Sequence, residues 1–435
     1  MKRDERKEVI SRITNNNVLG QGRKLRYQGK TEDFLIFDIP LNALIYNVEN
    51  GRIASWVKSY AKQNRVLDPE KPEDAAQIAQ FIYLSSEAAN KKTREHIAEC
   101  GQLEPGIITA DGVIVDGNRR ASLMLSILND PSATPDQKAR CEKFRTVVLP
   151  QNATQKDILR LETTYQLGTD EKVGYNVIEK YLHARDLEEN GFSVGEIQAF
   201  MGETKSSVQE MLEMVSLIDE YLESCDCTGI YTNLPSGWED DLLKLNTAVK
   251  KIKKGGVPWI PQDKLKRVEN DLKAVSFDYV RLNMKQDDGF DFRAIASTAN
   301  ANFLGNENIW NKFINRWQEA IEDVEEETLE DVLEKAGSSE ADFRRLLKAR
   351  DQVWRSKVKE ELRDSFADAK DKIENIKREE KPSALLRKAY NALDGVNLSV
   401  VYSLKEDEKR EMGLQLRDIL KLVDKISEVI NKNNQ

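Results

Sequence analysis

Five consecutive residues, Asp-Gly-Asn-Arg-Arg at positions 116–120, have the types and order of a phosphate-binding turn. They follow a short β-branched run and precede a segment with apolar residues at helical spacing, so they stand between a strand and a helix. Gly117 permits a sharp turn close to a ligand, and the unpaired amides of the following helix carry partial positive charge. The guanidinium groups of Arg119 and Arg120 can each donate two parallel N–H groups to two oxygens of one phosphate. The sequence therefore predicts an anion site at this turn.

The polar residues of the turn allow two interpretations. Asp116 and Asn118 can orient the two arginines, or they can hold a magnesium ion through water. They are equally typical of a helix cap that is followed by two solvated cations. Asp116 is therefore a candidate catalytic or metal-holding carboxylate, and the ordinary helix cap remains the alternative.

The segments around the turn predict a small mixed sheet. Asp111 and Gly112 form an Asp-Gly pair between two β-branched runs, which is a strong hairpin signal. Further strands are expected at residues 34–39 and 146–149. Apolar residues at helical spacing predict a helix over residues 73–89, which is expected to pack on this sheet.

Residues 151–224 are predicted to be helical. Glycines interrupt the pattern and leave two short helices, 194–201 and 205–218, with the spacing of a helix-turn-helix. The charge of this unit argues against DNA binding, because residues 187–224 contain nine acidic residues and one base, Lys205, and so repel phosphates. Two roles therefore remain open for it, sequence-specific DNA binding and protein docking.

The order of these parts resembles the ParB and sulfiredoxin superfamily. Residues 94–125 and the strand that follows are similar to its nucleotide-binding domain, in which a GxRR-type turn after a strand binds the triphosphate of CTP or ATP. Residues 161–166, 177–181, 191–197 and 202–208 are similar to the ParB linker and helix-turn-helix. The resemblance covers roughly residues 36–223, about half of the chain, and the shared order is more specific than any single motif.

The resemblance implies a fold, a ligand and a set of site residues. The fold is α+β, with a small mixed-sheet domain followed by an all-α helix-turn-helix domain and a helical C-terminal region. The cofactor is a nucleoside triphosphate, CTP or ATP, with Mg²⁺. The implied site residues are Gly117, Asn118, Arg119, Arg120, Asn47, Asn50 and Arg52 for the nucleotide, Glu162 for the metal or for catalysis, and Lys205, Ser206 and Ser207 for DNA.

The linker departs from the family pattern at two positions. ParB-type proteins have Glu-Asn-x-x-Arg there, with the Asn on magnesium and the Arg on phosphate, whereas this chain keeps Glu162 but has Thr163 and Gln166. Because Gln166 replaces the arginine that binds phosphate in the family, triphosphate binding is expected to be weaker or hydrolysis altered. The turn also lacks the cysteine on which sulfiredoxin activity depends, so that activity is not expected. The identity of the nucleotide and its turnover stay open.

Length and composition favour a helix-rich globular protein of several domains. The chain has 435 residues, and its net charge of -9 argues against coating DNA non-specifically over the whole surface. Four scattered cysteines and two histidines make neither a zinc module nor a disulfide framework, so we expect reduced thiols and a cytoplasmic protein without a membrane span. The expected parts are a basic N-terminal arm (1–30), the nucleotide-binding domain (31–150), a helix-turn-helix-like domain (151–233), a helical domain of unknown role (234–321) and a charged helical region (322–435).

The C-terminal region carries a seam of apolar residues at heptad spacing, which predicts a coiled-coil helix. This seam either joins two subunits or packs on the apolar stripe of residues 343–376 in the same chain. ParB-like proteins dimerise through their C-termini, and this resemblance favours a homodimer. The seam consists of Met412, Leu416, Ile419, Val423, Ile426 and Ile430.

Three hypotheses of function follow. The first is a ParB-like, nucleotide-gated dimeric switch or clamp that associates with DNA, in plasmid or chromosome maintenance or in phage defence. The second is an enzyme, an NTPase or nuclease effector of a defence system, with Asp116 and Glu162 holding a metal. The third is an adaptor that has lost nucleotide binding and docks proteins through the acidic helix-turn-helix or the C-terminal helices. The first is preferred because the order of the N-terminal half supports it, and enzymatic activity stays open.

Overall fold

The fold is known from a computed structural model, which describes residues 1–16, 22–166, 176–284, 290–299, 302–337 and 339–432. The chain divides into two compact units, Met1–Lys370 and Asp371–Gln435. The boundary between them lies inside one long helix, α15 (Glu340–Asp394). The first unit combines a five-stranded mixed sheet with many helices, so the predicted α+β class is confirmed.

The sheet has the strand order β1-β2-β5-β3-β4. Its strands are β1 (Gly22–Tyr27), β2 (Lys30–Pro40), β3 (Gly106–Ile108), β4 (Ile114–Asp116) and β5 (Lys143–Val148). The pair β3 and β5 is parallel, and the other neighbouring pairs are antiparallel. Strands were predicted from sequence for β2, β3, β4 and β5, and all four are present within a few residues of their expected positions.

The predicted Asp-Gly hairpin joins β3 to β4. Thr109 donates its backbone N–H to the carbonyl of Val113 at 2.9 Å, and Gly112 donates its own to the carbonyl of Thr109 at 3.0 Å. Gly112 has φ +88°, a left-handed conformation that a residue with a side chain rarely adopts. The turn chemistry visible in the sequence therefore fixes the position of β4, and with it the start of the phosphate-binding turn.

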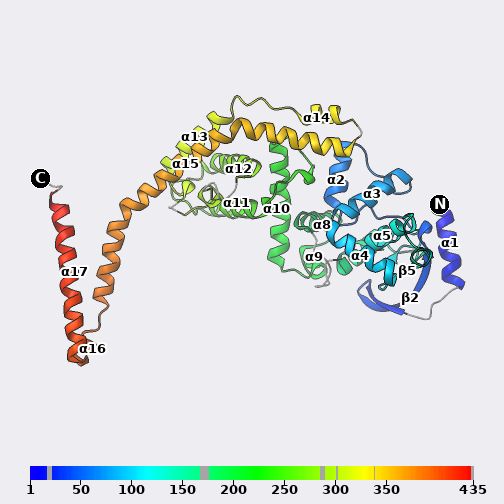
Figure 1. The fold of residues 1–435 in the computed structure, drawn as a ribbon, viewed down its shortest axis with the longest axis horizontal. Helices are drawn as coiled ribbons and strands as arrows, with labels where there is room; N and C mark the ends of the chain where they lie inside the picture. The colour runs from blue at the N-terminus through cyan, green and yellow to red at the C-terminus, as the bar shows by residue number, and fades with distance from the viewer. Residues whose placement is uncertain (17–21, 167–175, 285–289, 300–301, 338, 433–435) are drawn as a thin grey trace. The chain divides into compact units, whose positions relative to one another are not determined.

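The first 30 residues differ from the expected arm, because they contain a helix and a strand of the first unit. Helix α1 (Arg3–Asn16) lies beside β2 (Figure 1), and β1 pairs with β2 from Gly22 to Tyr27. Ile10 of α1 is buried in the core, and Arg6 donates its Nε–H to the carbonyl of Asp111 in the hairpin at 3.1 Å. Burial of apolar residues on one side of α1 outweighs the solvation of its charges on the other.

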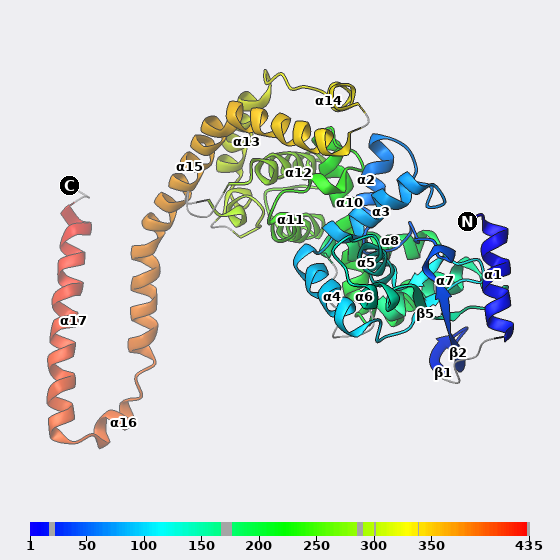
Figure 2. The same ribbon diagram turned by 45° about the vertical axis from the view of Figure 1, so that its right-hand side comes forward.

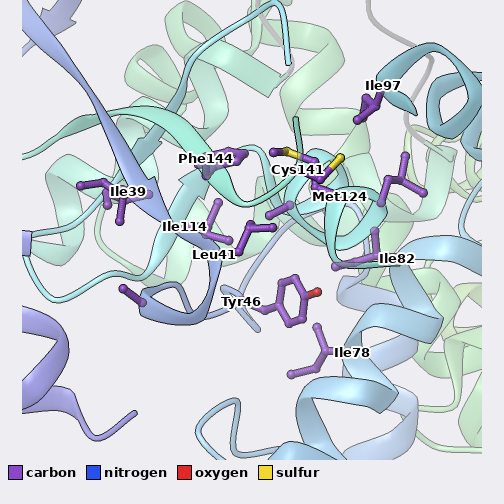
Figure 3. Close-up of a cluster of buried hydrophobic side chains, with 14 of the residues drawn as sticks. Ile39, Leu41, Tyr46, Ile78, Ile82, Ile97, Ile114, Met124, Cys141 and Phe144 are labelled. Carbon is purple, nitrogen blue, oxygen red and sulfur yellow. The ribbon is translucent and has the colours of Figure 1, made fainter. Parts of the chain in front are cut away.

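Helices pack against the sheet, whose buried side chains belong to two hydrophobic clusters. The helix expected over residues 73–89 divides in two, because the backbone of Ser86 leaves the helical conformation (φ -165°). Figure 3 shows the core cluster, in which Ile39 and Phe144 of the sheet meet Ile78, Ile82 and Met124 of the helices. The helices are α2 (Ala54–Gln63), α3 (Pro72–Leu84), α4 (Glu87–Cys100), α5 (Asn118–Leu128) and α6 (Pro135–Ala139).

The next helices have the predicted helix-turn-helix order. They are α7 (Gln155–Gln166), α8 (Val177–Glu189), α9 (Val194–Met201) and α10 (Lys205–Ser224). Ser193 and Glu196 form a capping box that starts α9, and Gly202 ends it in the left-handed conformation with φ +70°. Helix α10 packs against both α8 and α9 (Figure 1) and continues six residues beyond its expected end.

The rest of the first unit is helical. Buried apolar side chains hold its long helix α15, among them Phe343, Leu347, Trp354 and Val358 of the predicted stripe. Within the described residues, no helix is both long enough and apolar enough to cross a membrane. The remaining elements of this unit are α11 (Trp238–Lys253), α12 (Leu265–Leu282), α13 (Glu307–Ile321), α14 (Leu329–Ala336) and 3-10 turns at Leu41–Ala43, Tyr231–Asn233, Phe292–Ala294 and Phe303–Gly305.

The second unit contains the end of α15, the short helix α16 (Leu398–Ser403) and α17 (Glu406–Lys432). The end of α15 and α17 run in opposite directions and are joined through α16 (Figure 2). The seam predicted from the sequence lies on α17, and Leu416, Val423, Ile426 and Ile430 are exposed there. An apolar face of α17 is therefore exposed.

Candidate functional site

The predicted phosphate-binding turn lies between β4 and α5. Strand β4 ends at Asp116, Gly117 turns the chain with φ +115°, and α5 begins at Asn118. A Cβ atom at position 117 would stand only 2.6 Å from Cζ of Phe144. Both the backbone conformation and the close packing therefore require glycine here.

The two arginines of the turn lie on different sides of the start of α5. Arg120 Nη2 is 2.9 Å from Asp116 Oδ2, at the end of β4. Arg119 Nη2 instead donates to Thr93 Oγ1 on α4, at 3.0 Å. Consecutive residues of a helix are rotated by about 100°, which explains why neighbouring guanidinium groups reach different partners. The turn thus presents two cationic sides.

Arg119 has the features of an anion-binding group. Its Nε is buried and has no hydrogen-bond partner among the described residues. Burial, together with the positive charge of Arg52, lowers the pKa of Arg119 below its ordinary value. A buried cation close to a second cation is costly, and an anion between them would remove that cost.

The loop before α2 meets the turn, as the resemblance implied. Asn118 Oδ1 accepts the backbone N–H of Asn47 at 3.1 Å, so the first residue of α5 holds the loop directly. Asn50 Oδ1 accepts the backbone N–H of Arg52 at 3.0 Å, which shapes the loop from within. Asn47, Asn50 and Asn118 are all buried. The sequence-predicted residues of the loop and the turn therefore belong to one site.

Glu162 of α7 also holds this loop, through hydrogen bonds to Asn47 and Gly51. Its carboxylate is fully buried and accepts the side-chain N–H of Asn47 at 3.1 Å and the backbone N–H of Gly51 at 2.9 Å. Burial raises the pKa of Glu162 to about 8, the nearby charges of Glu49 and Asp116 add to this, and the Gly51 hydrogen bond opposes it. The carboxylate therefore ties the loop in place and tends to carry a proton at neutral pH.

Direct metal binding by Glu162 remains a prediction. A divalent cation needs an ionised carboxylate, whereas this one is buried, raised in pKa and already bonded to the loop. Asp116, the other candidate catalytic residue, is paired with Arg120. No group of three or more metal-ligating side chains occurs in the described part of the chain. Both carboxylates thus have structural partners in this conformation.

A second buried glutamate, Glu179 of α8, was not identified from the sequence. It accepts the backbone N–H of Ser55, in the first turn of α2, at 2.9 Å, and it also accepts the Ser55 hydroxyl. Burial raises the pKa of Glu179 to about 7. A sequence signal existed, because Glu179 is flanked by Ile178, Tyr181 and Leu182 on the apolar side of its helix. Together, Glu162 and Glu179 anchor both ends of the segment 47–55.

Arg23 of β1 is a further residue that the sequence analysis did not place at the site. Its Nη1 lies 3.9 Å from Asp116 Oδ2 and donates to the carbonyl of Pro105 at 2.7 Å. Its guanidinium carbon stands 5.0 Å from the ring centre of Tyr165 on α7. Because residues 1–30 were expected to form an arm, this arginine was not connected with the turn.

A cleft of about 570 Å³ opens beside the loop. Asn47 and Glu49 line it from the loop, Thr109 and Asp111 from the hairpin, and Gln151 from the segment before α7. Asn47 thus belongs both to the cleft and to the contact with Asn118 at the turn. A volume of this size is within the range of small-molecule sites.

The candidate DNA-binding residues lie at the start of α10. Lys205 and Ser206 are exposed there. Ser207 donates its hydroxyl to Glu203 at 3.0 Å and its backbone N–H to Thr204 Oγ1 at 3.1 Å, so it helps to cap the helix. DNA contact by these residues remains a prediction.

The chain was compared with known proteins in three ways. Neither the protein-family models nor the curated proteins give a match. Among solved structures, the chain is similar to the C-terminally truncated chromosome-partitioning protein ParB from Caulobacter crescentus, complexed with CTP-gamma-S. The match has 16% sequence identity and a TM-score of 0.17, and it covers 46% of this chain and 88% of that one.

Proposed function

We propose that this chain binds a nucleoside triphosphate, CTP or ATP, with its phosphates at the turn between β4 and α5. The observation that carries this proposal is Arg119, whose buried Nε lacks a partner while the charge of Arg52 acts on it. A phosphate oxygen supplies an acceptor for this Nε and a negative charge beside Arg119. The free amides at the start of α5 add to the attraction for phosphate.

The cleft beside Asn47 supports a nucleotide rather than a bare phosphate. Its volume of about 570 Å³ can accommodate a base and a sugar, and its polar lining offers both donors and acceptors. Gln151 is an amide, which can pair with the edge of a base. The nucleoside would therefore lie on the far side of Asn47 from the arginines.

The accompanying Mg²⁺ would be held mainly by the phosphates and by water. Glu162 and Asp116 do not fit as direct ligands while they bond to the loop and to Arg120. Magnesium commonly keeps several waters and binds through phosphate oxygens with few protein ligands. Either carboxylate would need to leave its present partner to reach the ion, and hydrolysis therefore stays a separate question.

Nucleotide binding would be transmitted to the helix-turn-helix through the anchored loop. The segment 47–55 is bonded to α7 by Glu162 and to α8 by Glu179, and α8 packs on α10. A ligand that shifts this segment would act on helices that bear the candidate DNA-binding residues. With the seam of α17 joining two copies, the protein would work as a nucleotide-gated switch or clamp on DNA, in plasmid or chromosome maintenance or in phage defence.

The test is the thermal stability of the wild type against CTP, ATP, GTP and UTP with Mg²⁺. A ligand at about 100 times its dissociation constant stabilises the folded state by about 2.7 kcal/mol, which raises the melting temperature by a few degrees. The shift should disappear in Arg119→Ala/Arg120→Ala and persist in Lys24→Ala/Arg26→Ala, which removes the same charge from exposed positions of β1. No shift with any nucleotide would overturn the proposal and favour the protein-binding adaptor.

A further inference from the structure

Strand β1 carries Arg23 to the phosphate-binding turn, although the two are almost a hundred residues apart in sequence. Pairing with β2 sets the register of β1, with Arg23 opposite Phe34. Tyr165 of α7 fixes the same strand, because its hydroxyl oxygen accepts the backbone N–H of Arg26 at 3.2 Å and its ring lies beside the Arg23 guanidinium. The position of Arg23 is therefore fixed by the pairing of β1 with β2 and by the contacts of Tyr165.

Asp116 brings Arg23 and Arg120 together. Its Oδ2 lies 2.9 Å from Arg120 Nη2 and 3.9 Å from Arg23 Nη1. The two arginine side chains are 19% and 18% exposed, so both remain accessible to a ligand from solvent. One carboxylate between two guanidinium groups leaves a net positive charge at this place.

Most of the hydrogen-bond donors of these arginines remain available. A guanidinium has five N–H donors in a planar fork. In the described part of the chain, Arg23 uses one hydrogen bond, to Pro105, and Arg120 uses one, to Asp116. Partly buried cationic donors of this kind are satisfied by water or by an anion, and phosphate oxygens match the fork best.

Arginines therefore lie on two sides of the start of α5. Arg119 lies on the side of α4, where it donates to Thr93 Oγ1 and the positive charge of Arg52 lowers its pKa. Arg23 and Arg120 lie together at the end of β4. Two linked phosphate groups offer one group to each side, whereas orthophosphate offers a single group.

We propose that Arg23 is a phosphate-binding residue, which acts with Arg120 on one group of a polyphosphate while Arg119 and Arg52 hold another. This inference rests on the proposed nucleotide function and deepens it. It assigns a role to the N-terminal strand, and it specifies a ligand with at least two linked phosphates. Asp116 acts as a positioning residue that aligns the two forks.

The test is isothermal titration with inorganic tripolyphosphate at low salt. Wild type should bind, and Arg23→Ala should raise the dissociation constant by about tenfold or more, because a charge-assisted contact of this kind is lost. Arg23→Lys should recover only part of the lost affinity, since lysine restores the positive charge but not the planar guanidinium group. Arg26→Ala is the matched control, an exposed arginine on the same strand, and its affinity should equal that of the wild type. The wild type should bind orthophosphate at least tenfold more weakly than tripolyphosphate.

The outcomes separate the two proposals. If Arg119→Ala/Arg120→Ala loses tripolyphosphate while Arg23→Ala binds it like the wild type, the role of Arg23 is overturned and the nucleotide site stands. If the wild type binds neither tripolyphosphate nor any nucleotide, both proposals fail. Melting of the unliganded variants serves as the folding control, and should Arg23→Ala not fold, Arg23→Lys and Arg23→Gln decide the question by the same comparison.

Discussion

Asn47 of the loop donates its side-chain amide to the fully buried carboxylate of Glu162, 115 residues further along the chain, over 3.1 Å. The same carboxylate accepts the backbone N–H of Gly51. Asn47 also gives its backbone N–H to Asn118, the first residue of α5. One loop residue therefore connects the predicted phosphate-binding turn with α7, and Glu162 holds its side chain.

Replacing Glu162 tests this dependence. Glu162→Ala would leave the amide of Asn47 and the N–H of Gly51 buried without an acceptor, at a cost of about 1–3 kcal/mol for each unsatisfied group. Glu162→Gln keeps an acceptor and the shape, so its loss should be smaller. Urea denaturation of both variants measures the difference. Equal and negligible losses would show that the loop does not need this anchor.

Stability should fall as the pH rises from about 5 to about 9. The pKa of Glu162 is raised to about 8 and that of Glu179 to about 7, from an ordinary value of 4.5, mainly by burial. A group with a raised folded-state pKa binds its proton more tightly when folded, so its stabilisation is complete at low pH and is lost as the pH passes the folded value. His183 has the opposite effect at acid pH. Burial lowers the pKa of its imidazole from 6.5 to about 4, so the folded state binds this proton less tightly than the unfolded chain does. This group therefore destabilises the fold as the pH falls below about 6.5.

Melting temperatures from pH 5 to pH 9 check this, with Glu162→Gln/Glu179→Gln as the comparison. The double variant cannot titrate at these positions, so its decline above pH 6 should be shallower than that of the wild type. Parallel curves would assign the pH dependence to other groups.

Gly117 should tolerate no side chain. Gly117→Ala places a Cβ 2.6 Å from Phe144 Cζ and forces a side-chain residue to φ +115°. Strain of this kind costs about 1–3 kcal/mol, and any shift of the turn also displaces the arginines. Gly195→Ala is the matched control, because Gly195 lies inside α9 and its Cβ would meet nothing within 4 Å. That change should be neutral or stabilising. Thermal melting with and without nucleotide measures both effects.

The sequence predicted those parts of the site that depend on local signals. The Asp-Gly hairpin, the glycine turn and the capped helices α9 and α10 each follow from a few neighbouring residues, and they are present as expected. Arg23 and Glu179 depend on distant contacts instead. Arg23 reaches Asp116 only because β1 pairs with β2, and Glu179 bonds to Ser55, 124 residues away. The apolar neighbours of Glu179 indicate that it is buried but do not identify its partner. The contact of Arg23 leaves no local signal, so residues 1–30 gave an expectation of an arm from charge alone.

The seam of α17 should make the protein a dimer. Leu416, Val423 and Ile430 recur every seven residues on its exposed face, and burying such a row against its own copy is the usual way in which a heptad seam gains stability. Leu416→Asp/Val423→Asp should therefore convert a dimer into a monomer, as measured by sedimentation equilibrium of the full chain. Arg417→Asp is a control outside the seam on the same helix and should leave the dimer intact. A wild type that sediments as a monomer at high micromolar concentration would contradict the dimeric switch. It would not affect the proposed nucleotide site, whose residues all belong to one chain.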